Sequence, residues 1–268
     1  MFKIFSKRNK SLLFELVRTD FKLRYQDSIL GYLWTLVKPM MMFAILYIVF
    51  VKFFRIGADF PNFSLYLLLG IVIFSFFQEA TMQGLTSIVV RGDLLRKISL
   101  PKYVIVISGT ISSLINFLLN LLVVILFCII SGVHFRTSIF LIPINILELY
   151  IIITGLSFFL SAIYVRFRDL GYIWEIIMQA MIYLVPIMYP MSMVENFSPT
   201  VARIILLNPL AQVTQDIRYN LISDHTATIW NTISNPVYHI IPLVLVVLLV
   251  FFASNYFKKS SKKFAEII

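Results

Sequence analysis

Six apolar stretches alternate with short polar segments along the chain, and each is interpreted as a membrane-spanning helix. They cover residues 33–54, 60–78, 103–133, 144–165, 176–194 and 237–257. The third contains no charged side chain, and it exceeds the ~20 residues that a helix needs to cross about 30 Å of hydrocarbon. The pattern therefore predicts an all-α integral membrane protein with six transmembrane helices in a single domain, residues 1–268.

The segment before the first span has helical periodicity. Residues 11–25 place charged and apolar side chains on opposite faces of a helix, which predicts an amphipathic helix at the membrane interface. Asp20 and Arg24 interrupt the apolar face at the four-residue spacing of a helical ion pair. Because a charged pair facing acyl chains is costly, we expect this face to rest against protein.

Two polar segments are expected to shape the loops. Residues 79–102 mix charged and apolar side chains and contain Pro101, which predicts a short cytoplasmic coupling helix, with a solvated connector as the alternative. In the external loop, residues 195–236, the runs 204–210 and 213–222 are too short to span the membrane and too apolar for a water-exposed loop. They are expected to form re-entrant half-helices. Pro186 and Pro190 predict a break in the fifth span.

Charge adds an orientation to this picture. Of the 23 Lys and Arg residues, 18 lie in segments assigned to one side of the membrane, and the positive-inside rule then places both termini in the cytoplasm. The net charge of +10 is therefore interpreted as orienting the chain among membrane lipids, with no nucleic acid as partner. The basic tail, residues 258–263, is expected to contact anionic lipid.

Motifs for catalysis are missing from the sequence. It contains no Walker A loop, and its three histidines are scattered and complete no metal site. Glu148 is the only acidic residue within a predicted span, and a single carboxylate is a poor proton path. Two alternatives to an ATP-driven permease stay open but disfavoured: an ion-coupled transporter or channel acting without an ATPase, and a membrane-embedded sugar or acyl transferase.

Five short motifs follow one another on the six-span frame. They are residues 18–25 with 30–34 and Pro39, residues 91–94 with 100–101, residues 167–170, residues 185–190, and residues 207–210 leading to Arg218. This ordered set resembles the type-2 ABC exporter permeases (ABC-2 family) that export polysaccharides and polyol phosphates, including O-antigen, capsule and teichoic acid. One departure is Thr19, which separates Arg18 from Asp20 where the family often joins arginine directly to aspartate.

The resemblance implies a permease subunit of an ATP-driven exporter of a lipid-linked glycan or polyol phosphate polymer, in the bacterial cytoplasmic membrane. It implies a homodimer of this chain bound to two ATP-binding cassette subunits, which carry ATP and Mg²⁺, so this chain is expected to have no cofactor, metal or catalytic residue. In the family, the entry helix and the loop after the second span contact the ATPase. The coupling candidates here are Asp20, Arg24, Arg91, Asp93, Arg96, Lys97, Arg168 and Asp169.

Aromatic residues suggest a route for the substrate. The chain has 25 Phe, 13 Tyr and 3 Trp, more than interfacial belts require. Flat rings can stack on the apolar faces of sugars while permitting sliding, although most of these rings are interpreted as packing or lipid-facing residues. The candidates for the substrate path are Tyr47, Phe74, Phe77, Tyr183 and Tyr189.

Overall fold

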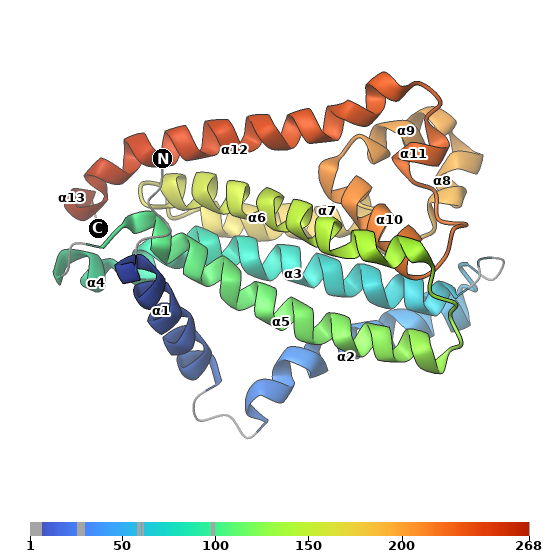
Figure 1. Cartoon of the computed structure of the whole chain (residues 1–268), viewed down its shortest axis with the longest axis horizontal. Coiled ribbons are helices and arrows are strands. Elements are labelled where there is room, and N and C mark those ends of the chain that lie inside the picture. Colours follow the sequence, from blue (N-terminus) through green and yellow to red (C-terminus); the bar gives the residue numbers. More distant parts are fainter. Residues whose placement is uncertain (1–6, 26–29, 58–59, 61, 98–99, 268) are drawn as a thin grey trace.

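A computed structural model describes residues 7–25, 30–57, 60, 62–97 and 100–267. The described part of the chain is helical and contains no strand. Long helices run side by side, and a group of short helices, α8 to α11, gathers at one end (Figure 1). Both chain termini lie at the other end. We call these two ends the distal end and the terminal end.

Five segments of the described chain are long and apolar enough to cross a membrane, and they identify a multi-pass membrane protein. The first joins η1 (Gly31–Leu33), α2 (Trp34–Leu46) and the π-helical η2 (Tyr47–Phe53). The others are α3 (Phe63–Val90), α5 (Lys102–Ile130), η3 (Thr137–Leu141) with α6 (Ile142–Tyr164), and η4 (Pro236–His239) with α12 (Ile240–Ser260) and η5 (Ser261–Lys263). An amphipathic helix, α1 (Lys7–Tyr25), precedes them, and α13 (Phe264–Ile267) follows.

The second span differs from the expected one, because α3 does not stop at Gln78 but continues to Val90. Gln78 and Glu79 are polar, yet buried residues such as Ala80, Leu85 and Ile88 keep one face of the helix in the core beyond them. The polar segment at the terminal end is correspondingly short and contains α4 (Gly92–Lys97). Glu79 thus lies within a span, and the expectation that Glu148 is the only acidic residue in one was wrong.

The fifth expected span is divided into two helices. α7 (Leu170–Leu184) is apolar but has only 15 residues, and α8 (Met191–Phe197) begins after Pro190. Val185 is extended, with ψ at 135°, as the residue before a proline prefers. The chain therefore breaks at the two prolines, although the helix before the break starts earlier than expected.

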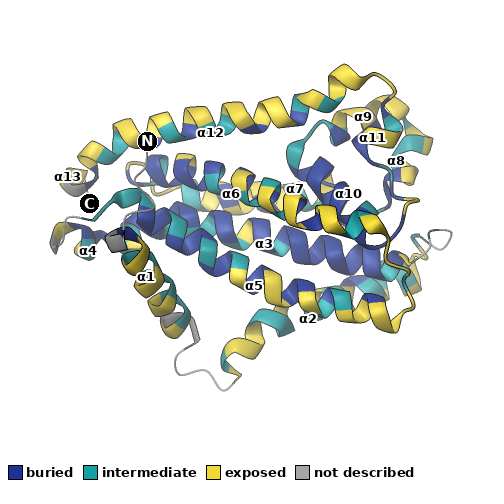
Figure 2. Cartoon of the chain, in the orientation of Figure 1, coloured by how far each residue is buried: buried dark blue, intermediate teal, exposed yellow. Residues whose placement is uncertain are grey.

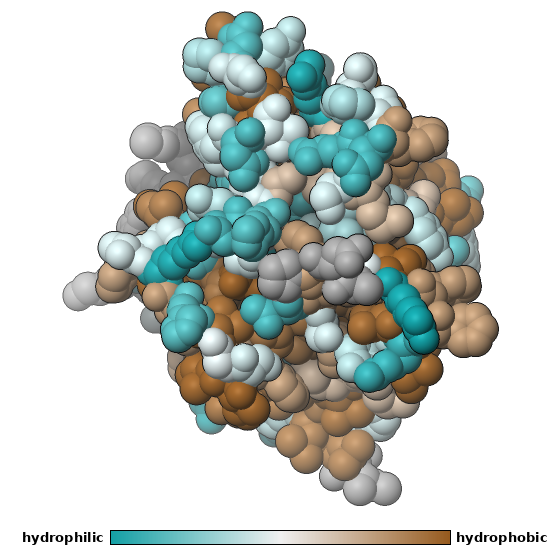
Figure 3. Space-filling view, turned by 90° about the vertical axis from the view of Figure 1, so that its right-hand side faces the viewer, coloured by the Kyte–Doolittle hydropathy of each residue, from teal (hydrophilic) through white to brown (hydrophobic). Residues whose placement is uncertain are grey.

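The distal end is built from short helices that the chain caps locally. α9 (Pro199–Leu206) begins after Ser198, whose side chain accepts the Val201 N–H at 3.4 Å. α10 (Pro209–Leu221) begins after Asn208, which accepts the Leu210 N–H at 3.0 Å. Figure 3 shows that hydrophilic side chains cover much of this end, as expected for a surface in contact with water. α11 (Ile229–Thr232) completes the group.

The core is organised around α3. In the most apolar 18-residue stretch of α3, 78% of the residues are buried (Figure 2). The corresponding fraction is 11% for Gly31–Phe53 and 17% for Pro236–Lys263. α3 packs on α5 and α6, and Gly84 permits the approach to α6 because a Cβ there would overlap the Ser157 side chain. The exposed apolar faces of α2 and α12 must contact lipid or another protein.

Candidate functional site

An ion pair at the terminal end ties α1 to the membrane-spanning helices. The Arg91 guanidinium pairs with the Asp20 carboxylate and donates from Nη1 to Ser108 Oγ at 2.7 Å. The two paired side chains are only 16% and 23% exposed, and Asn9 adds a bond to Tyr103 OH at 3.1 Å. The face of α1 that carries Asp20 thus rests against protein, as expected, and among the described side chains Asp20 pairs with Arg91. The Arg24 side chain lies outside the described residues.

Other coupling candidates at the terminal end are exposed. Asp93 and Arg96, on α4, are 91% and 54% exposed, and their charged atoms lie 4.0 Å apart. Arg168 and Asp169 are exposed in the turn before α7, where Arg168 lies 5.4 Å from the Tyr164 ring centre. Lys97 ends α4, and its side chain lies outside the described residues. Among the coupling candidates, Asp20 and Arg91 thus form an ion pair within the protein. The side chains of Asp93, Arg96, Arg168 and Asp169 lie on the surface.

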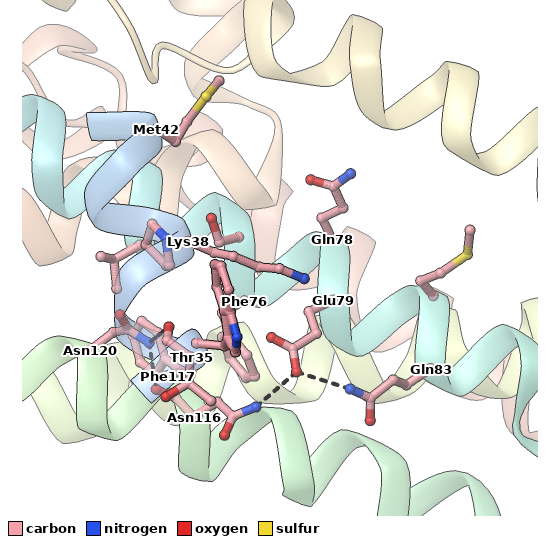
Figure 4. A pocket seen from close by; sticks show the side chains of 15 residues that line it. Thr35, Lys38, Met42, Phe76, Gln78, Glu79, Gln83, Asn116, Phe117 and Asn120 are labelled. Carbon is pink, nitrogen blue, oxygen red and sulfur yellow. Dashed lines mark hydrogen bonds between the residues drawn. The ribbon is translucent and has the colours of Figure 1, made fainter. Parts of the chain in front are cut away.

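A polar cavity of about 780 Å³ lies between α2, α3 and α5, near the middle of the two longer helices (Figure 4). Its polar lining consists of Thr35, Lys38, Ser75, Gln78, Glu79, Gln83, Asn116 and Asn120. The Lys38 side chain extends from α2 toward Glu79. Polar groups within spans are costly unless they serve a protein interior or a water-filled path, so this cavity is a candidate functional site.

A hydrogen-bond network holds the carboxylate in this cavity. Glu79 Oε1 accepts from Asn116 Nδ2 at 2.9 Å, from Gln83 Nε2 at 3.0 Å and from Ser113 Oγ at 3.3 Å. Asn120 Nδ2 donates to Thr35 O at 3.1 Å and thereby ties α2 to α5. The buried Oδ1 atoms of Asn116 and Asn120 have no hydrogen-bond partner within the described chain. They are two buried acceptors beside the cavity that the described residues leave without donors.

Aromatic rings form the apolar part of the same cavity. Phe76 and Phe117 stack with ring centres 4.6 Å apart, and Trp34 lines the side formed by α2. One ammonium, one carboxylate, several amides and flat rings in one cavity can bind the hydroxyls of sugars and the charge of a phosphate. This combination of groups is suited to binding.

The aromatic candidates are not brought together in one lining. Phe74 and Phe77 are 4% and 2% exposed and lie in the core, and neither lines the cavity described above. Tyr47 begins η2, with Lys52 Nζ 5.6 Å from its ring centre. Tyr183 is 64% exposed on α7, and the Tyr189 hydroxyl donates to Tyr183 O at 2.8 Å.

The cavity residues were not among the candidates, although the sequence contained a signal for them. Glu79 and Gln83 are four residues apart, as are Asn116 and Asn120 within an otherwise apolar span. Polar residues repeated at helical spacing inside a span mark a face that avoids lipid. Lys38, which lies within the expected first span, also lines the cavity.

A second arginine, Arg218, is fully buried at the distal end. Its Nε donates to Tyr66 O at 3.2 Å and its Nη2 to Ile187 O at 2.9 Å, while Nη1 bonds to Pro186 O. The guanidinium lies 3.5 Å from the Tyr66 ring centre. A Cβ at Gly70 would overlap this group, so glycine is required there. Arg218 thus joins α10, α3 and the break after α7.

Known proteins resemble this chain over nearly all of its length. The sequence profile described as ABC-2 type transporter matches residues 11–222. The chain is 27% identical over 260 residues to the O-antigen export system permease protein RfbA of Myxococcus xanthus, covering 97% of this chain and 96% of that protein. A protein of the same name from Klebsiella pneumoniae is 29% identical over 268 residues, covering 98% of both. Another from Klebsiella pneumoniae is 30% identical over 213 residues, covering 77% and 80%.

Proposed function

The chain belongs to the ABC-2 type transporter family, and from this premise we propose that it exports a lipid-linked glycan across the bacterial inner membrane. As a permease of this family it is a transport component and not an enzyme, and ATP is bound by a partner subunit. The observation that carries the choice of substrate is the polar and aromatic cavity among α2, α3 and α5. It agrees with relatives that are named as O-antigen export permeases.

The cavity fits the chemistry of a sliding glycan. Hydroxyls donate and accept hydrogen bonds, and the side-chain amides of Gln78, Gln83, Asn116 and Asn120 do both. Lys38 supplies a positive charge for a phosphate, as a lipid pyrophosphate or a polyol phosphate would require. Tyr47, Tyr183 and Tyr189 stay candidates for a further part of the path, because none is in the protein core.

A second copy of the chain would complete the path. Only 11% of the residues in the most apolar stretch of Gly31–Phe53 are buried. On α7, Ile173 is 51% exposed and Ile176 is 66% exposed. Apolar surfaces of this kind contact lipid or protein, and most soluble and membrane oligomers form by symmetric pairing of one surface. We assign these helices to a homodimer whose two cavities face a common path.

α3 links the cavity to the terminal end as one continuous helix. Its middle carries Gln78 and Glu79, and its last residue, Val90, directly precedes Arg91 and α4. A partner that docks on the exposed side chains of Asp93, Arg96, Arg168 and Asp169 would therefore displace α3 as one rigid helix. The Asp20–Arg91 pair would carry the same displacement to α1. In this arrangement both termini and the ATPase are on the cytoplasmic side.

Substitution of the cavity residues tests this function. Glu79→Ala and Asn116→Ala should each lower the amount of glycan at the cell surface about tenfold, since each removes a bond to a charged or hydroxyl group. Ser161→Ala is the matched control, because Ser161 is buried in α6, outside the cavity, and its hydroxyl donates to Phe158 O within its own helix. Permease abundance and thermal stability are measured in parallel. Full export by both cavity variants would contradict the assignment.

A further inference from the structure

A second, larger cavity of about 1410 Å³ opens between α6 and α12 and reaches α10. Its walls on the two spans are apolar, and several of their residues are exposed: Ile144 by 61%, Leu147 by 57%, Leu243 by 57% and Val247 by 60%. This volume exceeds the roughly 300–1,000 Å³ of pockets for drug-sized ligands. A groove of this size, open to the side of two membrane spans, fits hydrocarbon chains.

The distal part of this groove has the opposite chemistry. Asp216 and Gln212, from α10, line it and are 6% and 5% exposed. Asp216 Oδ2 accepts from Gln212 Nε2 at 2.5 Å and from Trp230 Nε1 at 3.3 Å. Asp216 Oδ1 and Gln212 Oε1 are buried, and within the described chain neither has a hydrogen-bond partner. Two buried acceptors beside the groove therefore lack donors among the described residues.

The lining of this part of the groove contains two acidic side chains. Glu148, from α6, faces Asp216 and Gln212, and the lining contains no lysine or arginine. His239 is turned to the backbone, with Nε2 2.8 Å from Ile233 O. The described chain offers no group of three or more His, Cys, Asp or Glu residues that could hold a metal ion. A compact cation with several N–H donors satisfies this set better than a metal ion or a neutral hydroxyl.

We propose that the groove binds a phospholipid with a primary ammonium headgroup, such as phosphatidylethanolamine. The ammonium lies between Glu148 and Asp216 and donates to their carboxylates, and the acyl chains follow the apolar walls of α6 and α12. The polar part of the groove is at the distal end and the apolar part extends toward the middle of the spans. This is the direction in which a lipid of the distal leaflet points. The site is separate from the cavity assigned to the substrate.

Native mass spectrometry of the purified, delipidated protein tests the proposal. The probes are phosphatidylethanolamine, phosphatidylcholine with the same acyl chains, phosphatidylglycerol, and free phosphoethanolamine. Phosphatidylcholine is the matched ligand, because three methyl groups replace the N–H donors while the charge is kept. We expect phosphatidylethanolamine to be retained at least about tenfold better than the other two lipids, since a hydrogen bond to a charged group is lost without the N–H.

Variants locate the site. Glu148→Gln combined with Asp216→Asn should remove the preference for phosphatidylethanolamine, whereas Asp224→Asn, at a carboxylate outside the groove, should keep it. Val247→Trp, at an exposed wall position, should lower retention of all three lipids without unfolding the protein. If the double variant unfolds, Glu148→Gln alone must reduce the preference. Equal retention of phosphatidylethanolamine and phosphatidylcholine by the wild type, an unchanged preference in the carboxylate variants, or binding of free phosphoethanolamine as tight as that of the lipid would overturn the proposal.

Discussion

Two arginines anchor segments at opposite ends of the molecule, and their surroundings differ. Arg91 pairs with one carboxylate, Asp20, and both side chains keep some contact with solvent. Arg218 is fully buried and bonds to backbone carbonyls of three residues, Tyr66, Pro186 and Ile187. An ion pair near solvent can open and re-form at small cost, whereas a buried guanidinium that loses its acceptors leaves an uncompensated charge. We therefore expect a movable anchor at the terminal end and a permanent one at the distal end.

This difference agrees with the two tasks that we propose for the ends. The terminal end must transmit movement from the ATPase, so α1 and α4 need two arrangements of similar energy. The distal end must hold a broken helix and a half-helix in place, because their unpaired backbone groups are tolerated at membrane depth only when protein satisfies them. Arg218 supplies donors for carbonyls at the break after α7.

Removal of the distal anchor should have the largest effect. Arg218→Met keeps much of the side-chain volume but leaves several buried carbonyls without donors, and it should lower the free energy of unfolding by about 3–5 kcal/mol. Thermal unfolding in detergent measures the loss. Arg203→Met, at an exposed position on α9, is the control and should change little. A stability loss equal to that of the control would show that Arg218 is no anchor.

The terminal anchor should be weaker. A double-mutant cycle of Asp20→Asn and Arg91→Gln should give a coupling free energy of about 1 kcal/mol, because the pair is partly exposed. The single variants should loosen α1, which limited proteolysis of the purified protein would detect at its N-terminal region. A coupling energy as large as the loss caused by Arg218→Met would remove the distinction between the two anchors.

Charges on α4 should affect docking without affecting stability. Asp93→Lys combined with Arg96→Glu reverses two exposed side chains, so unfolding should change by less than about 0.5 kcal/mol. Binding to the ATPase subunit, measured by co-purification, should fall because reversed charges oppose docking. Normal co-purification and normal export would mean that α4 is only a solvated connector.

The smallest expected effect is a pH dependence at the distal surface. The Asp224 carboxylate pairs with Arg136, and this hydrogen bond holds the pKa of Asp224 below its usual value. The stabilisation is therefore complete above the ordinary pKa of about 3.9 and is lost as pH falls through the lowered value. Carbon-detected NMR of aspartate carboxyls should show this pKa rising toward the ordinary value in Arg136→Ala. An unchanged Asp224 pKa would contradict the pairing.

Sequence patterns predicted most of the fold. The expected spans at residues 103–133 and 144–165 closely match α5 and α6. A long apolar run forms a helix in a bilayer because the helix satisfies all of its backbone hydrogen bonds internally. The break at Pro186 was also expected, from proline chemistry. Short helices were expected in the external loop, but the run 204–210 does not form one helix, because α9 ends at Leu206 and α10 begins at Pro209. The end of α3 was not, since Gln78 was interpreted as the last residue of a span and Glu79 as the first residue of a loop, whereas both line a cavity.

The site was harder to predict, because periodicity gives the faces of a helix and not what each face contacts. Phe74, Phe76 and Phe77 all belong to the core, and of these three Phe76 also lines the cavity. Arg218 was counted among the charges of an external loop. Its guanidinium donates to Ile187 O, 31 positions away, and to Tyr66 O, 152 positions away, as well as to the nearby Gln215 side chain. Partners so far apart in the sequence cannot be predicted from the local pattern of polar and apolar residues.

Reconstituted transport tests the proposed function most directly. The chain is placed in vesicles with its ATP-binding partner and a fluorescent lipid-linked glycan, and exposure of the glycan on the side away from the ATPase is followed. We predict that exposure requires both ATP and the partner, and that Glu79→Ala slows it while Ser161→Ala does not. Exposure driven by an ion gradient without the ATPase, at the same rate in the Glu79 variant, would contradict both the ATP-driven mechanism and the role of the cavity.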